Sequence, residues 1–225
     1  RYAMHVKGME LPRQEPRVAK GFGLAHATSN RGADHLYALP TMDLAGAKDA
    51  AQCFFPADRV AELLDPANET YKPDLVVFSE HYCAVSDALG VCKFTTTETY
   101  ALYPEDLAQG LSALWAHPVG ERELMEVGER IVNLERLLNS IQGRVRAYDA
   151  YIPQKLTVPM SEGPLKGRRV DPELVGSILD AFYREQGWSN EGLVTDKTPG
   201  LDIYLIANLI GSGGNIILYK PSVCR

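Results

Sequence analysis

Residues 121–143, ERELMEVGERIVNLERLLNSIQG, constrain the fold of this chain more than any other segment. The apolar residues follow one another in steps of three and four, with charged residues between them, a spacing that places them on one side of an α-helix. They are Leu124, Val127, Ile131, Leu134, Leu138 and Ile141. Gly143 is suited to cap the helix end. The pattern predicts a surface helix with one buried stripe and a solvated face that carries glutamates such as Glu121.

Further segments also have helical signals. Residues 73–89 are apolar on most faces, as expected for a buried helix, and Pro104 and Pro172 each stand where proline favours the first turn of a helix. Weaker signals predict short helices in residues 18–29 and 57–64. Residues 1–40 read as an irregular section with a short strand, and residues 144–170 as a long exposed connection. The fold class predicted is mainly α and multihelical.

Composition limits the classes of function. The 225 residues carry a formal net charge of -6, so they offer no basic patch for nucleic acid or an anionic membrane surface. Four cysteines without a CxxC pair, and no signal peptide, indicate a reducing, cytoplasmic setting. The start at Arg1 suggests a fragment. Near the other end, residues 203–219 are apolar but broken by GSGGN, which favours two short strands over a membrane span.

The stretch SDALGVCKF, residues 86–94, contains the cysteine with the most suggestive surroundings. A free cysteine usually packs as a small hydrophobic residue. Beside Cys92, however, Gly90 lets backbone amides approach a ligand, Asp87 can accept from N–H groups of a planar heterocycle, and Lys93 favours a thiolate. Cys92 is therefore competent to ligate a metal, although an iron–sulfur cluster needs further thiolates that this sequence does not place nearby.

A second polar cluster lies in ATSNRGADHLYALP, residues 27–40. His35 in this segment could act as an acid or base near neutral pH, or simply be hydrogen-bonded in a loop. The other histidines share no spacing and are expected to be structural. No Ser-His-Asp arrangement, phosphate loop or HExxH motif supports hydrolysis or nucleotide chemistry.

Several of these motifs, in order, resemble the carboxy-terminal part of the tungsten-dependent aldehyde ferredoxin oxidoreductase family. They are HVKGMELP, EPRVAKGFGLAHATSNRGADHL, DALGVCKF, VGERIVNLERLLN and the helix that ends in YREQGW. The resemblance covers roughly residues 4–194. It implies a helical domain, residues 1–194, that closes over an absent amino-terminal cofactor domain, followed by an atypical tail, residues 195–225.

The resemblance also implies a site. In the family a CxxCxxxC group supplies three thiolates of a 4Fe-4S cluster, and the cysteine of D-x-x-G-(L/V)-C supplies the fourth, the place that Cys92 occupies. The same motif touches one pterin of a tungsten or molybdenum bis-pterin cofactor, which implies contacts from Asp87, Gly90, Val91 and Cys92. His35 maps to a histidine near the metal, as a proton donor or hydrogen-bond partner. No CxxCxxxC occurs in this chain.

The function expected from the resemblance is oxidation of a small aldehyde to a carboxylic acid, with electrons passed through the cluster to ferredoxin or a similar acceptor. The chain would be inactive without the missing amino-terminal region, and a homodimer is possible in such enzymes. Two alternatives stay open at this stage. One is a related tungstopterin enzyme that reduces aromatic acyl-thioesters, and the other is a cofactor-free helical interaction module.

Overall fold

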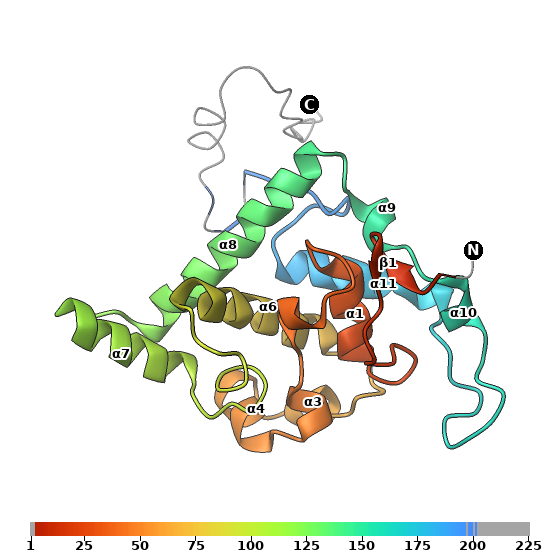
Figure 1. Ribbon diagram of the computed structural model, residues 1–225, viewed down its shortest axis with the longest axis horizontal. Coiled ribbons are helices and arrows are strands. Elements are labelled where there is room, and N and C mark those ends of the chain that lie inside the picture. The colour runs from red at the N-terminus through yellow and green to blue at the C-terminus, as the bar shows by residue number, and fades with distance from the viewer. Residues whose placement is uncertain (1–2, 197, 200, 202–225) are drawn as a thin grey trace.

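The computed structural model describes residues 3–196, 198, 199 and 201 (Figure 1). The chain begins with a short antiparallel hairpin, β1 (His5–Val6) and β2 (Met9–Glu10), in which His5 pairs with Glu10 and Val6 with Met9. Every other regular element in the described part is a helix. The predicted strand in the amino-terminal section and the mainly α fold class are confirmed, and the strands predicted at 203–219 lie outside the described residues.

Four long helices and one shorter helix form the frame. They are α1 (Lys20–Thr28), α6 (Lys72–Leu89), α7 (Pro104–Trp115), α8 (Glu121–Ile141) and α11 (Pro172–Glu185). Short helices fill the connections. They are α2 (His35–Ala38), α3 (Met42–Ala45), α4 (Lys48–Phe54), α5 (Val60–Leu63), α9 (Arg146–Asp149) and α10 (Gln154–Thr157).

Helix α6 lies at the centre of the fold and packs against α1, α2, α8 and α11 (Figure 1). Two hydrophobic cores meet on it. Val76 faces the core shared with α8 and α11, whereas Leu75 and Tyr82 face the core built with α4, α5 and α7. This arrangement explains why residues 73–89 are apolar on most faces, because a helix in the middle of a domain has little surface left for water.

The predicted helix starts are confirmed by their hydrogen bonds. The Asp171 carboxylate accepts from the Glu173 amide at 3.1 Å, with Pro172 as the first residue of α11. At α7 the Tyr103 amide donates to the Asp106 carboxylate at 2.7 Å. These contacts satisfy amides that have no partner inside the helix.

The buried face of α8 is rotated from the stripe that the sequence predicts. Leu124 is buried as expected, but Leu134 and Leu138 are 39% and 48% exposed. The buried positions farther along α8 are instead Val132, Asn133, Arg136 and Leu137. The prediction of one buried apolar stripe is therefore wrong for the second half of α8, because that half buries polar side chains that have partners elsewhere in the fold.

Residues 144–170 are not simply an exposed connection. They contain α9 and α10, and within them Asp149 is 1% exposed and Leu156 3% exposed. Asp149 binds Lys7 Nζ at 2.6 Å and Arg136 Nη2 at 2.7 Å. The segment is held down because a carboxylate buried between two cations anchors it to the hairpin and to α8.

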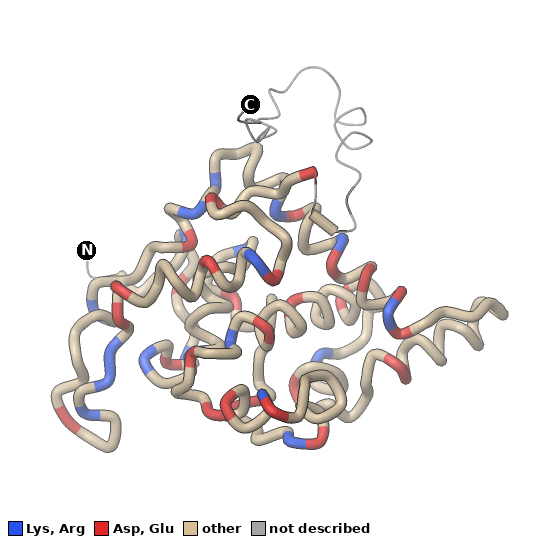
Figure 2. The backbone as a smooth tube through the Cα atoms, turned by 180° about the vertical axis from the view of Figure 1, so that it is seen from behind, with Lys and Arg blue, Asp and Glu red and all other residues tan. Residues whose placement is uncertain are grey.

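Charged residues of both signs are scattered over the described part of the chain (Figure 2). Among the described residues, no helix is both long enough and apolar enough to pass through a membrane.

Candidate functional site

The end of α6 presents the DALGVC motif. Gly90 follows the last helical residue with φ +69°, a left-handed conformation that glycine adopts without strain. The Gly90 amide donates to the Asp87 carbonyl, and the Val91 amide donates to the Ser86 carbonyl at 2.9 Å. This turn directs Val91 and Cys92 away from the helix end, so the motif forms a loop on the surface.

Cys92 is exposed and has a free thiol. A methyl group built on Gly90 would meet no atom within 4 Å, so the space beside the loop is open. Val91 is half-buried against the core below. The thiol therefore faces a surface that another group or another domain can cover, rather than an aliphatic interior.

Lys93 joins the two polar clusters of the sequence. Its Nζ donates to Asp87 Oδ2 at 2.8 Å and to the Leu36 carbonyl at 2.6 Å. Leu36 follows His35, the first residue of α2, and Asp34 caps that helix by accepting from the Leu36 amide at 2.8 Å. The ammonium group thus binds the loop of Cys92 to the loop of His35, and its contacts are with a carboxylate and a carbonyl.

Lys93 holds together the two loops that carry the sequence-predicted residues. His35 is half-buried, and Asp87, Gly90 and Cys92 are exposed. Within the described residues, no group of three or more His, Cys, Asp or Glu side chains is arranged to hold a metal ion. Cys92 can offer one thiolate to a metal ion or cluster, but these residues do not supply a full set of ligands.

Sequence reasoning missed Glu80, a buried carboxyl two turns before Asp87 on α6. Glu80 is 1% exposed, it accepts from Gln186 Nε2 at 2.7 Å, and its other oxygen lies 3.4 Å from the Thr28 hydroxyl oxygen. It also lines a pocket of about 160 Å³ whose wall includes Asp87. The only sequence signal for Glu80 is that a charged residue occupies a position whose spacing predicts the buried face of a helix.

Burial raises the pKa of the Glu80 carboxyl to about 8, although Lys7 and Arg136 oppose the shift; Asp149 adds to it. In an unfolded chain the pKa of a glutamate is about 4.3. Between these values the unfolded chain loses a proton that the folded chain retains, so the contribution of Glu80 to stability falls as pH rises from about 4.3 to about 8. Each pKa unit corresponds to about 1.4 kcal/mol, which makes the total loss a few kcal/mol.

We expect Glu80→Gln to remove this loss. The introduced side-chain amide can still accept from Gln186, and it can donate to the Thr28 hydroxyl, which itself donates to the Leu24 carbonyl. The measurement is the free energy of unfolding by urea from pH 4 to pH 9. Burial lowers the pKa values of His26 and His81 to about 4, so both forms should lose stability as pH falls below about 6.5. The stability of the parent chain relative to the Glu80 variant should therefore fall steadily from pH 5 to pH 8, and a constant difference between the two forms would contradict the assignment to Glu80.

The fold and the surface define a class of protein: a mainly helical domain with an exposed free thiol, Cys92, on a loop that Lys93 links to the loop of His35. Residues 1–199 match the family described as aldehyde ferredoxin oxidoreductase, domains 2 & 3. The chain belongs to this family, as its motifs indicate.

Curated relatives agree with the family match. The chain is 32% identical over 197 residues to the tungsten-containing aldehyde ferredoxin oxidoreductase of Thermococcus kodakarensis, covering 86% of this chain and 29% of the relative. It is 32% identical over 210 residues to the enzyme of that name from Pyrococcus horikoshii, covering 91% and 32%. An aliphatic sulfonate oxidoreductase subunit of Pyrococcus furiosus is 24% identical over 205 residues, covering 88% and 27%. The chain spans less than a third of the length of these proteins.

A solved structure shares the fold. The active-site complex of a benzoyl coenzyme A reductase, bound to 1,5-dienoyl-CoA, superposes with a TM-score of 0.52 at 18% sequence identity. The match covers 78% of this chain and 28% of that chain.

Proposed function

We propose that this chain is the carboxy-terminal part of an oxidoreductase that converts aldehydes to carboxylic acids at a tungsten or molybdenum bis-pterin centre. Electrons would leave through a 4Fe-4S cluster to ferredoxin or a similar acceptor. The observation that carries the proposal is the exposed thiol of Cys92, held by Lys93 beside the loop of His35. The tungsten-containing relatives support the choice of chemistry.

Cys92 would provide the single thiolate that this chain adds to the cluster, and Asp87, Gly90 and Val91 would contact a pterin. The geometry fits these roles, because the motif forms an exposed loop with open space at Gly90. The cofactor would supply the two-electron redox chemistry, which removes two electrons and two protons from an aldehyde and one water. His35 would donate or accept a proton, or hydrogen-bond the substrate, from its place at the start of α2.

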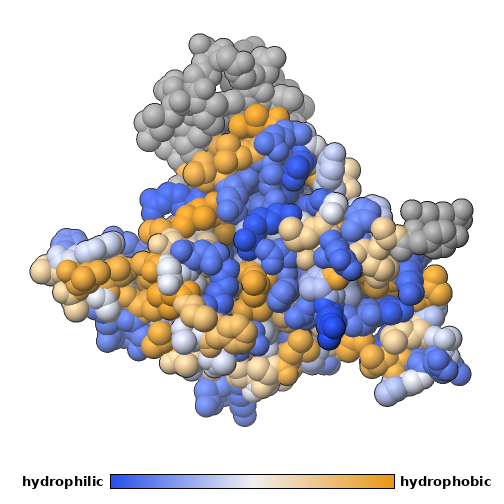
Figure 3. All heavy atoms as spheres, viewed as in Figure 1, coloured by the Kyte–Doolittle hydropathy of each residue, from blue (hydrophilic) through white to orange (hydrophobic). Residues whose placement is uncertain are grey.

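The rest of the polypeptide would cover this surface. Exposed apolar side chains surround the motif: Leu36 is 41% exposed and Phe94 is 67% exposed. Figure 3 shows further hydrophobic side chains along α8, where Leu134 and Leu138 are exposed. Such apolar surface is typical of a face that packs against another domain.

The test is the metal content of the complete polypeptide, expressed with the upstream region that carries CxxCxxxC and purified without oxygen. We expect Cys92→Ala to lower iron well below four atoms per chain, because the cluster loses one of its four thiolates. Cys53→Ala is the matched control, since Cys53 is also exposed and free but lies on α4. Full iron content in the Cys92 variant would refute the ligand assignment.

Reduction of an acyl-thioester is the second candidate. It keeps the same roles for Cys92 and Asp87, and the fold shared with the benzoyl coenzyme A reductase complex motivates it. Assays of the complete enzyme with aldehydes and with aromatic acyl-CoA esters distinguish the two reactions. An iron-free and tungsten-free complete protein would instead support a helical interaction module.

A further inference from the structure

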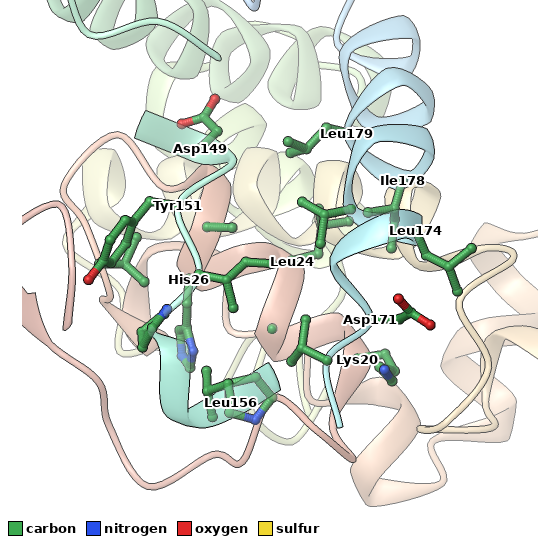
Figure 4. Close-up of a pocket in the computed structure, with 18 of the residues that line it drawn as sticks. Lys20, Leu24, His26, Asp149, Tyr151, Leu156, Asp171, Leu174, Ile178 and Leu179 are labelled. Atoms are coloured by element: carbon green, nitrogen blue, oxygen red, sulfur yellow. The ribbon is translucent and has the colours of Figure 1, made fainter. Parts of the chain in front are cut away.

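A second cavity lies between α1, α10, α11 and the amino-terminal hairpin (Figure 4). Its volume is about 80 Å³, and none of His35, Glu80, Asp87 or Cys92 lines it. Figure 4 shows Leu24, Ile178 and Leu179 on one side and Leu156 on another. The cavity is therefore walled mainly by apolar side chains.

The charged groups in this wall already have partners. Lys20 Nζ binds Glu69 at 2.8 Å, Asp149 binds Lys7 and Arg136, and the Asp171 carboxylate caps α11. A charged ligand would thus lose its hydration without gaining a counter-ion, which is costly in an apolar cavity. The wall favours a neutral ligand.

His26 is the polar exception. It is 1% exposed, and neither of its ring nitrogens has a hydrogen-bond partner among the described residues. Figure 4 places the His26 side chain in the wall with Leu156 and Tyr151. A buried polar group without a partner destabilises the fold, so a ligand that pairs with it recovers part of that cost.

The protonation state of His26 defines the matching group. Burial lowers its pKa to about 4, with a smaller contribution from nearby His35, while Asp34 opposes the shift. The ring is therefore neutral near pH 7 and carries one donor and one acceptor. A hydroxyl group has the same pair of functions and can use either nitrogen.

We propose that this cavity binds a short aliphatic alcohol, with the hydroxyl at His26 and the carbon chain among the leucine and isoleucine side chains. The size limits the ligand, since a cavity of about 150 Å³ holds a benzene ring and this one is smaller. A chain of about four carbons is suitable. The proposal does not depend on the metal chemistry, so either can fail without the other.

The experiment uses the 225-residue chain and follows methyl NMR signals of Leu24, Leu156 and Ile178 during titration with 1-butanol. Diethyl ether, an isomer of butanol that only accepts hydrogen bonds, and butanoate, which is charged, are the comparison ligands. We expect saturable shifts with butanol at millimolar concentration and at least fivefold weaker binding of the other two. No saturable shift, or equal affinity for butanol and ether, would overturn the proposal.

Two variants test the hydrogen bond of His26 and the open volume of the cavity separately. His26→Phe keeps a ring and removes both nitrogens, so the preference for butanol over ether should disappear. Ile178→Trp fills the cavity and should abolish binding of both, and circular dichroism checks that each variant is folded. An unchanged preference in the His26 variant would contradict the role of the imidazole. Loss of butanol binding in the complete polypeptide would show that another segment occupies the cavity and would also overturn the proposal.

Discussion

Asp149→Asn is expected to lower the free energy of unfolding by about 3–5 kcal/mol, because it leaves two buried cations without their shared counter-ion. Lys7 and Asp149 have side chains that are 5% and 0% exposed, and Arg136 is 2% exposed. The Tyr183 hydroxyl donates to the same carboxylate oxygen as Arg136, at 2.7 Å. Water cannot replace the lost charge at this depth, so the cost approaches that of breaking a buried ion pair.

The effect should extend to the candidate site. Lys7 Nζ also donates to the Ser29 carbonyl at 2.8 Å, at the start of the loop that leads to His35. When Asp149 no longer holds the Lys7 ammonium, the loop from residue 29 to residue 34 loses an anchor. Hydrogen exchange of these amides should therefore be faster in the variant, and urea unfolding gives the loss of stability.

Asp180→Asn is the matched control for this prediction. Asp180 binds Arg146 Nη1 at 2.6 Å, a distance as short as those around Asp149, but its side chain is 47% exposed. Ion pairs in contact with water contribute about 0–1 kcal/mol. A cost for Asp149→Asn that is no greater than the cost for Asp180→Asn would contradict the importance of burial.

This network shows where sequence reasoning reaches its limit. Lys7, Arg136 and Asp149 stand far apart in the chain, and each is a residue type that usually faces water. No local spacing connects them, so the rotated buried face of α8 and the anchored segment 144–170 could not be predicted. Helix starts at Pro104 and Pro172 could be predicted because the proline and the carboxylates beside it act within one turn.

One part of the candidate site could likewise be predicted from the sequence, and another part could not. The loop of Gly90 and Cys92 follows from local chemistry, since glycine ends α6 in a left-handed conformation. The second bond of Lys93, to the Leu36 carbonyl, spans 57 residues and could not be read from the motif. The resemblance to known motifs placed His35 in the same site, but the contact that joins the two loops is visible only in the fold.

Helices α6 and α8 cross in close contact, and this packing depends on one glycine, Gly128. A methyl group on Gly128 would overlap the His81 carbonyl oxygen and would lie 3.0 Å from a methyl of Val85. The nearest atom belongs to the backbone of α6, so no side-chain rotation can relieve the overlap. The two helices can pack at this distance only because residue 128 has no side chain.

Gly128→Ala is therefore expected to lower the free energy of unfolding by about 3 kcal/mol or more, through the separation of α6 from α8. Gly110→Ala is the matched control, since Gly110 lies inside α7 with no atom within 4 Å of an added methyl group. There the higher helix propensity of alanine should raise stability by about 0.5–1 kcal/mol. Opposite signs for the same substitution in two helices would show that the contact, and not the helix propensity, decides the outcome. A Gly128 variant as stable as the parent chain would mean that α6 and α8 can shift apart freely, and then α6 would not fix the position of Asp87 relative to α8.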